Sequence, residues 1–385
     1  MNETVHNWQR ETDEHGMCWL TLNVPGGANV LSHAVLEELD GILDDLHQNP
    51  PHGLVFASGK NGAFIAGADV GEFSQIIDEQ QAQEMIRRGQ AIMDRIAALP
   101  FPTLALINGY CLGGGLELSL ACDYRIAQEG ARTRIGLPEV KLGIHPGFGG
   151  SVRSIQRIGP LAAMNLMLSG RTVDPRAARR MGLVDEAVPE RQLRAAAVYY
   201  LMNRPPVQAP DWKGRLANLQ PVRPLLARIM RRQVAARAPR AHYPAPYALL
   251  DLWVEHGSDE RAMLEAEAES VARLIVGQTA RNLVRVFELQ NRLKSLGREG
   301  AEDIHHVHVI GGGVMGGDIA AWCALQGFRV TVQDQDTNAL GRAVHRAQRI
   351  FKRRFKRDRL AIQAAMDRFI PDNRGVGLRH ADVVI

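Results

Sequence analysis

The sequence has few of the features that mark membrane, secreted or metal-binding proteins. Its four cysteines, at positions 18, 111, 122 and 323, form no CxxC pair, which indicates free thiols in a reducing compartment and predicts no metal site. No apolar run approaches the roughly 18 residues that a transmembrane helix needs. The polar, acidic start resembles neither a signal peptide nor a transit peptide. Together these absences predict a cytoplasmic protein with no transmembrane segment.

The sequence also has little charge of one sign and few aromatic residues. Lys and Arg number 46 against 42 Asp and Glu, which leaves a net charge of only +4. Aromatic residues make up 5%, so neither a basic surface nor stacking platforms for nucleic acid are expected. With 45% hydrophobic and 23% charged residues, the composition is that of a globular protein. A length of 385 residues predicts two or three domains.

The first 190 residues alternate between predicted strands and predicted helices, which indicates an α/β domain with parallel strands covered by helices. Strands are expected at 17–24, 53–58 and 102–110, and helices at 33–47 and 79–98.

The chain changes character after residue 190. Residues 191–300 contain helical patterns and proline-rich breaks, including one or two long helices over 261–296 that end at Gly297. A second α/β unit begins at residue 304. The predicted domains are therefore an α/β domain at 1–190, a helical tail and linker at 191–300, and a second α/β domain at 304–385.

Three segments of the first domain suggest chemistry. They are 64–70 (FIAGADV), 113–117 (GGGLE) and 137–143 (LPEVKLG), the last followed by PGFGG at 146–150. Small residues let backbone N–H groups approach a ligand oxygen, and two such groups aimed at one carbonyl form an oxyanion hole. The carboxyls of Glu117 and Glu139 could position one water and transfer its protons. A lone GGG is most often a turn, and a single glutamate on a helix is most often solvated. The prediction of an active site therefore depends on the three segments occurring together, not on any one of them.

These segments identify a resemblance to the crotonase, or enoyl-CoA hydratase/isomerase, superfamily over residues 15–190. The matching blocks are FIAGAD, NGYCLGGGLELSLACDYRIA, LPEVKLGIHPGFGGSVR and LSGRTVDPRAARRMGLVDEAVP. The resemblance implies a spiral of repeated ββα units that binds acyl-CoA.

Site residues carry over from this resemblance one by one. Glu117 and Glu139 match the two catalytic glutamates, and Ala68 and Gly114 match the residues whose N–H groups hold the thioester oxygen. Ala66 and Val70 match the loop that cradles the CoA adenine. His145 is a departure, because the family usually has an aliphatic residue there. We expect it to be a packed or partly exposed substitution, with tuning of substrate choice or pH response as the alternative.

A second motif follows the strand predicted at 307–310. Gly311, Gly313 and Gly316 form GxGxxG between this strand and a helix, and Asp334 ends the next strand, 23 positions after Gly311. In this context the glycines let the backbone approach a pyrophosphate at a helix N-terminus, and the acidic residue accepts from a ribose 2′-OH. The motif therefore predicts NAD rather than NADP.

This stretch resembles the start of the NAD-binding domain of 3-hydroxyacyl-CoA dehydrogenases. The order of the parts resembles the α subunits of fatty-acid β-oxidation complexes, which implies a thiolase subunit as partner in an α2β2-type assembly. By the same resemblance, residues 380–385 match a later Rossmann strand, and the dehydrogenase's catalytic His–Glu pair would lie beyond it. We therefore expect a complete hydratase, a partial Rossmann unit, weak NAD affinity and no dehydrogenation by this chain.

The leading functional prediction is hydration of trans-2-enoyl-CoA to 3-hydroxyacyl-CoA. One alternative is double-bond isomerisation in the same site, which needs a single carboxylate. Another is a CoA-binding scaffold without catalysis. The basic run RAQRIFKRRFKRDR at 346–359 is expected to be a solvated helix with a buried stripe, with contact to CoA phosphates or a partner as the alternative.

Overall fold

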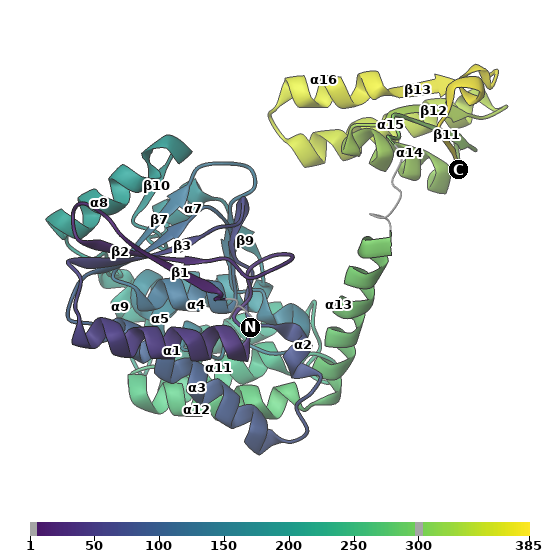
Figure 1. The fold of residues 1–385 in the computed structure, drawn as a ribbon. Coiled ribbons are helices and arrows are strands. Elements are labelled where there is room, and N and C mark those ends of the chain that lie inside the picture. Colours follow the sequence, from purple (N-terminus) through teal and green to yellow (C-terminus); the bar gives the residue numbers. More distant parts are fainter. Residues whose placement is uncertain (1–5, 297–302) are drawn as a thin grey trace. The chain divides into compact units, whose positions relative to one another are not determined.

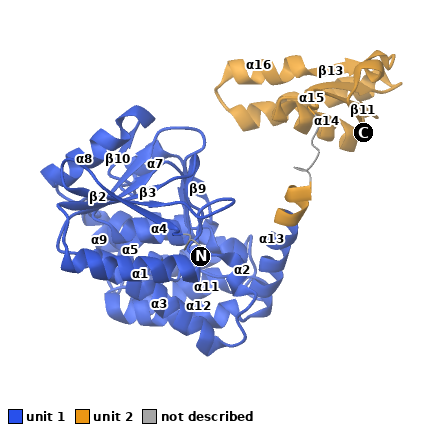
Figure 2. Ribbon diagram, in the orientation of Figure 1, with its two compact units in different colours: residues 1–290 blue, residues 291–385 orange. Residues whose placement is uncertain are grey.

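The computed structural model describes residues 6–296 and 303–385. It divides into two compact units, residues 1–290 and 291–385, which Figure 2 colours separately. The predicted helix end at Gly297 and the predicted boundary at residue 300 lie outside the described residues.

Unit 1 contains a six-stranded sheet of short, mostly apolar strands (Figure 1). In order of neighbours, its strands are β1 (Trp8–Thr12), β2 (Met17–Leu22), β3 (Gly53–Ser58), β5 (Thr103–Ile107), β7 (Tyr124–Gln128) and β10 (Glu186–Val188). All neighbours run parallel except β1 and β2. The run Leu54–Phe56 and all of β5 are buried, because both faces of the sheet are covered.

A second, four-stranded sheet repeats the order of the first. Its strands are β4 (Gly62–Ile65), β6 (Gly109–Leu112), β8 (Arg134–Gly136) and β9 (Thr172–Val173). The successive pairs β3/β4, β5/β6 and β7/β8 each place one strand in each sheet. Each successive pair therefore adds one strand to each of the two sheets. This is the spiral of repeated ββα units that the resemblance implied.

The single strand predicted over 102–110 was wrong. The structure divides it into β5 and β6, which belong to different sheets. The break is at Asn108, whose side-chain amide donates to the carbonyl of Lys60 at 3.0 Å. Directly after it, a Cβ on Gly109 would lie 1.9 Å from the carbonyl carbon of Gly62, so only glycine allows β6 to approach β4 this closely. Apolar periodicity cannot reveal such a change of sheet.

Helices cover both sheets of unit 1. Those up to residue 190 are α1 (His33–Gln48), α2 (Val70–Phe73), α3 (Glu79–Ala97), α4 (Gly114–Ala121), α5 (Gly150–Ile158), α6 (Pro160–Ser169), α7 (Pro175–Arg180) and the 3₁₀ turn η1 (Glu139–Leu142). The predicted helices at 33–47 and 79–98 correspond to α1 and α3. Each helix begins after a residue whose side chain caps it. The side chain of Ser32 accepts a hydrogen bond from the N–H of Val35, and that of Asp78 accepts one from the N–H of Gln81.

From residue 190 on, the described part of unit 1 consists of helices joined by loops. The helices are η2 (Glu190–Gln192), α8 (Leu193–Asn203), α9 (Trp212–Ala217), α10 (Arg223–Ala235), α11 (Ala245–His256), α12 (Glu260–Ile275) and α13 (Gln278–Leu296), the last of which continues past residue 290 into unit 2. Trp253 of α11 and Val271 of α12 are buried in the same core as the sheets. These helices are therefore an integral part of unit 1. Across the described ranges, no helix is both long and apolar enough to cross a membrane.

Unit 2 is a parallel sheet with helical connections. Its strands, in order of neighbours, are β13 (Phe369–Asp372), β12 (Arg329–Gln333), β11 (His306–Ile310) and β14 (Val383–Val384). The connections are α14 (Val314–Gln326), α15 (Thr337–Phe355), α16 (Arg359–Arg368) and the 3₁₀ turn η3 (Val376–His380). The strand order 3-2-1-4 is that of a dinucleotide-binding half. The basic run lies mostly on α15, which buries Phe351 and exposes Lys352 to Arg354, as predicted.

A buried ion cluster joins the edge strand β10 to the first sheet. Asp185 is 5% exposed and accepts hydrogen bonds from both Arg125 and Arg157, which are also buried. It also accepts from the backbone N–H of Arg125 at 2.9 Å. Removing one partner of a buried pair leaves an uncompensated charge, which is strongly destabilising.

We therefore expect Asp185→Asn to lower the free energy of unfolding by about 3–5 kcal/mol. Glu129→Gln is the control, because Glu129 pairs with Arg176 at a site where the arginine is 74% exposed, and such exposed pairs contribute little to stability. Urea denaturation followed by circular dichroism measures both. Equal stability of the two variants would contradict the importance of the cluster.

Candidate active site

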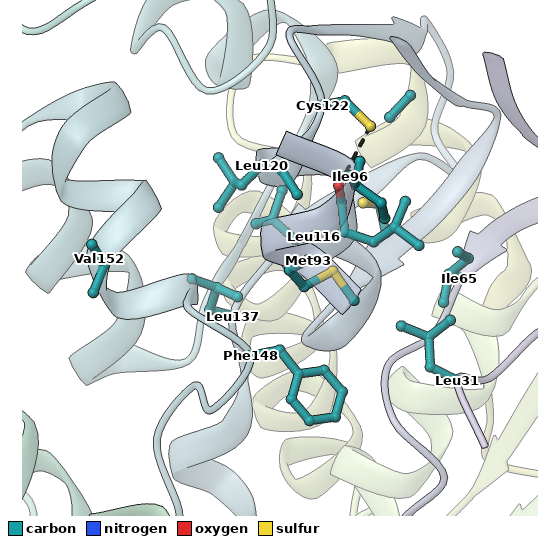
Figure 3. Close-up of a cluster of buried hydrophobic side chains, with 14 of the residues drawn as sticks. Leu31, Ile65, Met93, Ile96, Leu116, Leu120, Cys122, Leu137, Phe148 and Val152 are labelled. Atoms are coloured by element: carbon teal, nitrogen blue, oxygen red, sulfur yellow. Dashed lines mark hydrogen bonds between the residues drawn. The ribbon is translucent and has the colours of Figure 1, made fainter. Parts of the chain in front are cut away.

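A cavity of about 330 Å³ collects every residue that the sequence singled out in the first domain. Its walls include Ala66, Ala68, Val70, Gly114, Glu117 and Glu139. The three segments meet because they lie at the carboxyl ends of β4, β6 and β8. These strands run parallel, so their carboxyl ends share one edge of the second sheet. Figure 3 shows the apolar packing beside α4, where Leu116, Met93 and Phe148 lie together in the core.

The backbone amides of Ala68 and Gly114 lie next to each other at the cavity. A Cβ built on Gly114 would lie 3.4 Å from the amide nitrogen of Ala68. Neither amide donates a hydrogen bond to any group in the described residues. Gly114 is the first residue of α4, so its N–H adds the positive end of a helix to the same place. The pair has the proximity that an oxyanion hole requires.

Gly113 turns the chain into this arrangement. Its φ of +51° lies in a region that L side chains rarely adopt. A Cβ on Gly113 would also lie 3.2 Å from Oε1 of Glu139, so a side chain here would press on the carboxylate. The first glycine of the run is therefore required both by backbone conformation and by space.

Glu117 is a buried carboxylate held by one of its oxygens. The residue is 3% exposed, and Oε1 accepts from the N–H groups of Phe148 at 2.7 Å and Gly150 at 2.8 Å. Oε2 accepts no hydrogen bond from the described residues. Burial, followed by the like charge of Glu267, raises the pKa of Glu117 to about 8. A carboxyl with such a pKa can exchange a proton near neutral pH.

Glu139 lies across the cavity, at the start of η1. Both of its carboxyl oxygens are shielded from solvent, and neither has a hydrogen-bond partner among the described residues. Burial, followed by the nearby Glu117, raises the pKa of Glu139 well above its ordinary value. An unpartnered buried carboxyl is most stable when protonated, so Glu139 is the better proton donor of the two.

Glu267 is a third buried carboxylate, which the sequence analysis missed. It lies on α12, is fully buried, and is bonded to the same turn as Glu117. One signal could have revealed it: Glu267 occupies an i, i+4 ladder whose other members, Met263, Val271 and Ile275, are all buried. A glutamate on the apolar stripe of a helix indicates a buried charge.

His145 also lines the cavity and is fully buried. Its Nδ1 donates to the carbonyl of Pro146, and its Nε2 accepts from the hydroxyl of Ser270, each at 2.8 Å. Burial lowers the pKa of His145 to about 4, so the ring is neutral at neutral pH. The departure from the family pattern is therefore a packed, hydrogen-bonded residue.

The cavity has further lining residues that the sequence did not single out. Lys141 brings a positive charge to the wall, and Phe287 of α13 adds an aromatic ring that is 39% exposed. Ala66 donates its N–H to the carbonyl of Asn29, which fixes the loop beside Val70. A cation and an exposed ring next to this loop suit a phosphorylated, aromatic ligand group.

In unit 2, the predicted glycines form the turn between β11 and α14. A Cβ on Gly311 or Gly313 would meet nothing within 4 Å, so the loop borders open space at the start of the helix. A Cβ on Gly316 would lie 2.0 Å from the carbonyl oxygen of Gly311, so this glycine permits close packing of the turn. Asp334 follows β12 and accepts from the N–H of Gly312 at 2.7 Å. The glycine turn and the acidic residue thus lie together, and the open space fits a pyrophosphate.

Comparison with known proteins finds a family match in each unit. Residues 306–385 match the family model described as "3-hydroxyacyl-CoA dehydrogenase, NAD binding domain". A relative from Aliivibrio fischeri, named "Fatty acid oxidation complex subunit alpha", is 37% identical over 88% of this chain and 50% of its own length. A relative of the same name from Vibrio cholerae is 34% identical over 98% of this chain and 55% of its own. The chain thus spans about half the length of these curated relatives.

Solved structures show the same fold. An enoyl-CoA hydratase from Rhodobacter sphaeroides has a TM-score of 0.58 at 23% identity, covering 74% of this chain and 91% of its own. The human mitochondrial delta3-delta2-enoyl-CoA isomerase has a TM-score of 0.55 at 23% identity, covering 77% of this chain and 100% of its own. Residues 12–208, just over half of the chain, match the family model described as "Enoyl-CoA hydratase/isomerase". The protein therefore belongs to the enoyl-CoA hydratase/isomerase family.

Proposed function

We propose that unit 1 hydrates trans-2-enoyl-CoA thioesters to 3-hydroxyacyl-CoA. The observation that carries this proposal is the arrangement of one cavity. It holds two adjacent free amides, a carboxylate with a free oxygen, Glu117, and an unpartnered buried carboxyl, Glu139. Addition of water across a conjugated double bond needs a stabilised enolate oxygen, a base for the water and an acid for C2.

The amides of Ala68 and Gly114 would donate to the thioester oxygen, which gains negative charge as water attacks C3. Glu117 accepts one proton from the attacking water, whose oxygen forms the new C3–O bond. Glu139 gives its proton to C2. Transfer of the water's proton from Glu117 to Glu139 restores the starting state. The assignment follows from hydrogen bonding, because two N–H donors stabilise the anion of Glu117, whereas neither oxygen of Glu139 has a hydrogen-bond partner in the described part of the chain.

Double-bond isomerisation is the second candidate activity. It moves one proton between C4 and C2 and requires a single carboxyl, which Glu139 could supply in the same cavity. Retention of both carboxyls favours hydration as the main activity. A scaffold without catalysis would bind acyl-CoA with no turnover of either kind.

CoA would be held at the mouth of the cavity. The loop of Ala66 and Val70 supports the adenine, and Lys141 is the lining cation suited to its phosphates. The names of the relatives suggest a role in fatty-acid oxidation within a complex. On that basis we propose β-oxidation intermediates as substrates and a thiolase subunit as partner.

For unit 2 we propose NAD binding. Gly311, Gly313 and the start of α14 would hold the pyrophosphate, and Asp334 the adenosine ribose. Hydrogen bonds from backbone N–H groups lower the pKa of Asp334 below its usual range. The carboxylate is therefore ionised and would repel a 2′-phosphate. When bound, NAD accepts a hydride from a substrate carbon.

The first test is Glu139→Gln. Loss of the proton donor should reduce hydration of crotonyl-CoA by about 10²–10⁴, because amide and carboxyl have the same shape but only the acid transfers a proton. Absorbance at 263 nm follows the reaction, and calorimetry with a saturated acyl-CoA should show retained binding. Turnover near that of the unchanged protein would contradict the role of Glu139.

The second test compares Gly114→Pro with Gly114→Ala. Both add a Cβ 3.3 Å from Leu31 Cδ1, but only proline removes the N–H. Proline is tolerated at the first position of a helix, so the fold should persist. We expect proline to cost about 10²–10³ in kcat beyond the loss caused by alanine. Equal activity of the two variants would show that this amide is not an oxyanion donor.

The third test concerns NAD. Gly316→Ala forces a methyl group against the Gly311 carbonyl and should abolish NAD binding measured by titration calorimetry. Gly341→Ala is the matched control, because a Cβ at this α15 position meets nothing within 4 Å. Unchanged NAD affinity in Gly316→Ala would refute the assignment of this turn.

A further inference from the structure

Four successive backbone amides donate to two buried carboxylates in the turn at residues 148–151, which leads into the first residues of α5. The N–H groups of Phe148 and Gly150 donate to Glu117. The N–H groups of Gly149 and Ser151 donate to Glu267, at 2.7 and 3.1 Å. Alternate amides therefore point to opposite sides of the turn, one side to a cavity-lining carboxylate and the other to α12.

The turn can take this shape only with a glycine at its centre. Gly149 has a φ of +90°, and a Cβ there would lie 2.0 Å from Nη1 of Arg153. Three of these amides, those of Gly149, Gly150 and Ser151, belong to the positive start of α5, where the helix offers them no acceptor of its own and anions are stabilised. The carboxylates of Glu117 and Glu267 therefore hold the turn from opposite sides, where it enters α5.

Glu267 is bonded in a way that only a carboxylate allows. It receives four hydrogen bonds: from the N–H of Gly149, from the N–H and hydroxyl of Ser151, and from the side-chain amide of Gln90 at 3.1 Å. Each of its oxygens accepts two of them. A glutamine has one acceptor oxygen and an NH₂ group, so it would leave donors of the turn without a partner.

We propose that Glu267 is a positioning residue for the hydration reaction, which fixes the 148–151 turn and through it the orientation of the Glu117 carboxylate. This inference rests on the proposed hydratase function. Among the described residues, the carboxylate of Glu117 accepts hydrogen bonds only from amides of this turn, so any movement of the turn moves the base relative to the water. Glu267 itself does not line the cavity.

The negative charge of Glu267 also affects the pKa values of the two carboxyls that line the cavity. The titratable and charged groups around the turn are Glu117, Glu139, Glu267, His145, Lys141, and Arg153 paired with Asp94. The negative charge of Glu267 raises the pKa of Glu117 and, more weakly, that of Glu139. Removal of that charge lowers both pKa values, so the pH optimum of hydration moves to lower pH.

Three variants of the full chain separate orientation from charge. Glu267→Gln removes the charge and part of the hydrogen bonding; we expect kcat to fall about tenfold to hundredfold, and the pH optimum to move down on the order of one unit. Glu267→Asp keeps the charge but shortens the side chain, so kcat should fall without a shift of the optimum. Glu269→Gln, exposed on the same helix, is the control and should change neither.

Each outcome has a distinct meaning. No hydration by the unchanged protein would contradict the proposed function and the inference with it. Hydration with an unaltered kcat and pH optimum in folded Glu267→Gln would overturn this inference alone. If Glu267→Gln does not fold, Ser151→Ala carries the test, because it removes one donor to Glu267 and no donor to Glu117. An unchanged kcat in Ser151→Ala would then overturn the proposal.

Discussion

Burial of three carboxylates around one turn is the constraint on which the site of unit 1 depends. A buried ion without hydrogen bonds is costly, and three like charges in one region repel each other. The chain offsets this cost unequally: within residues 6–296 and 303–385, Glu267 accepts hydrogen bonds from four donors, Glu117 from two and Glu139 from none. This gradient of donors favours the anion at Glu267 and the neutral acid at Glu139. The acid and base of the proposed hydration are thereby distinguished before any substrate binds.

The fold supplies the donors. The ββα spiral brings the loop after β4 and the loop after β6 to one place, where Ala68 and Gly114 present their amides. The turn at 148–151 belongs to neither sheet, and it is held between α4, which carries Glu117, and α12, which carries Glu267. A helix from beyond residue 190 therefore completes the support of a site whose lining residues come mainly from the first 150 residues. This explains why α12 is packed into the core of unit 1.

The sequence predicted the parts of this site whose signal is local. Strands such as β3, the helices α1 and α3, and the cavity-lining Glu117 and Glu139 could all be read from short segments, because composition and spacing within each segment carry the information. Two features could not. The division of 102–110 at Asn108 depends on a backbone approach between β4 and β6 that only the folded chain makes. Glu267 lies 128 residues after Glu139, and its role comes from hydrogen bonds across the fold; only its position on the buried stripe of α12 hinted at it.

Burial and hydrogen-bond donors also make the carboxyls of the two units differ in pKa. In unit 1, carboxyls are buried and their pKa values are raised, which suits proton transfer near neutral pH. In unit 2, backbone donors at a glycine turn hold the pKa of Asp334 low, so this carboxylate stays ionised and suits hydrogen bonding to hydroxyl groups. Glycine serves opposite purposes in the two places. Gly149 lets the backbone wrap around buried anions of the protein, whereas Gly311 and Gly313 leave open the space in which an anionic ligand could bind. One residue type thus supports the buried carboxyls of the proposed hydratase site in the first unit and the open turn of the proposed dinucleotide site in the second.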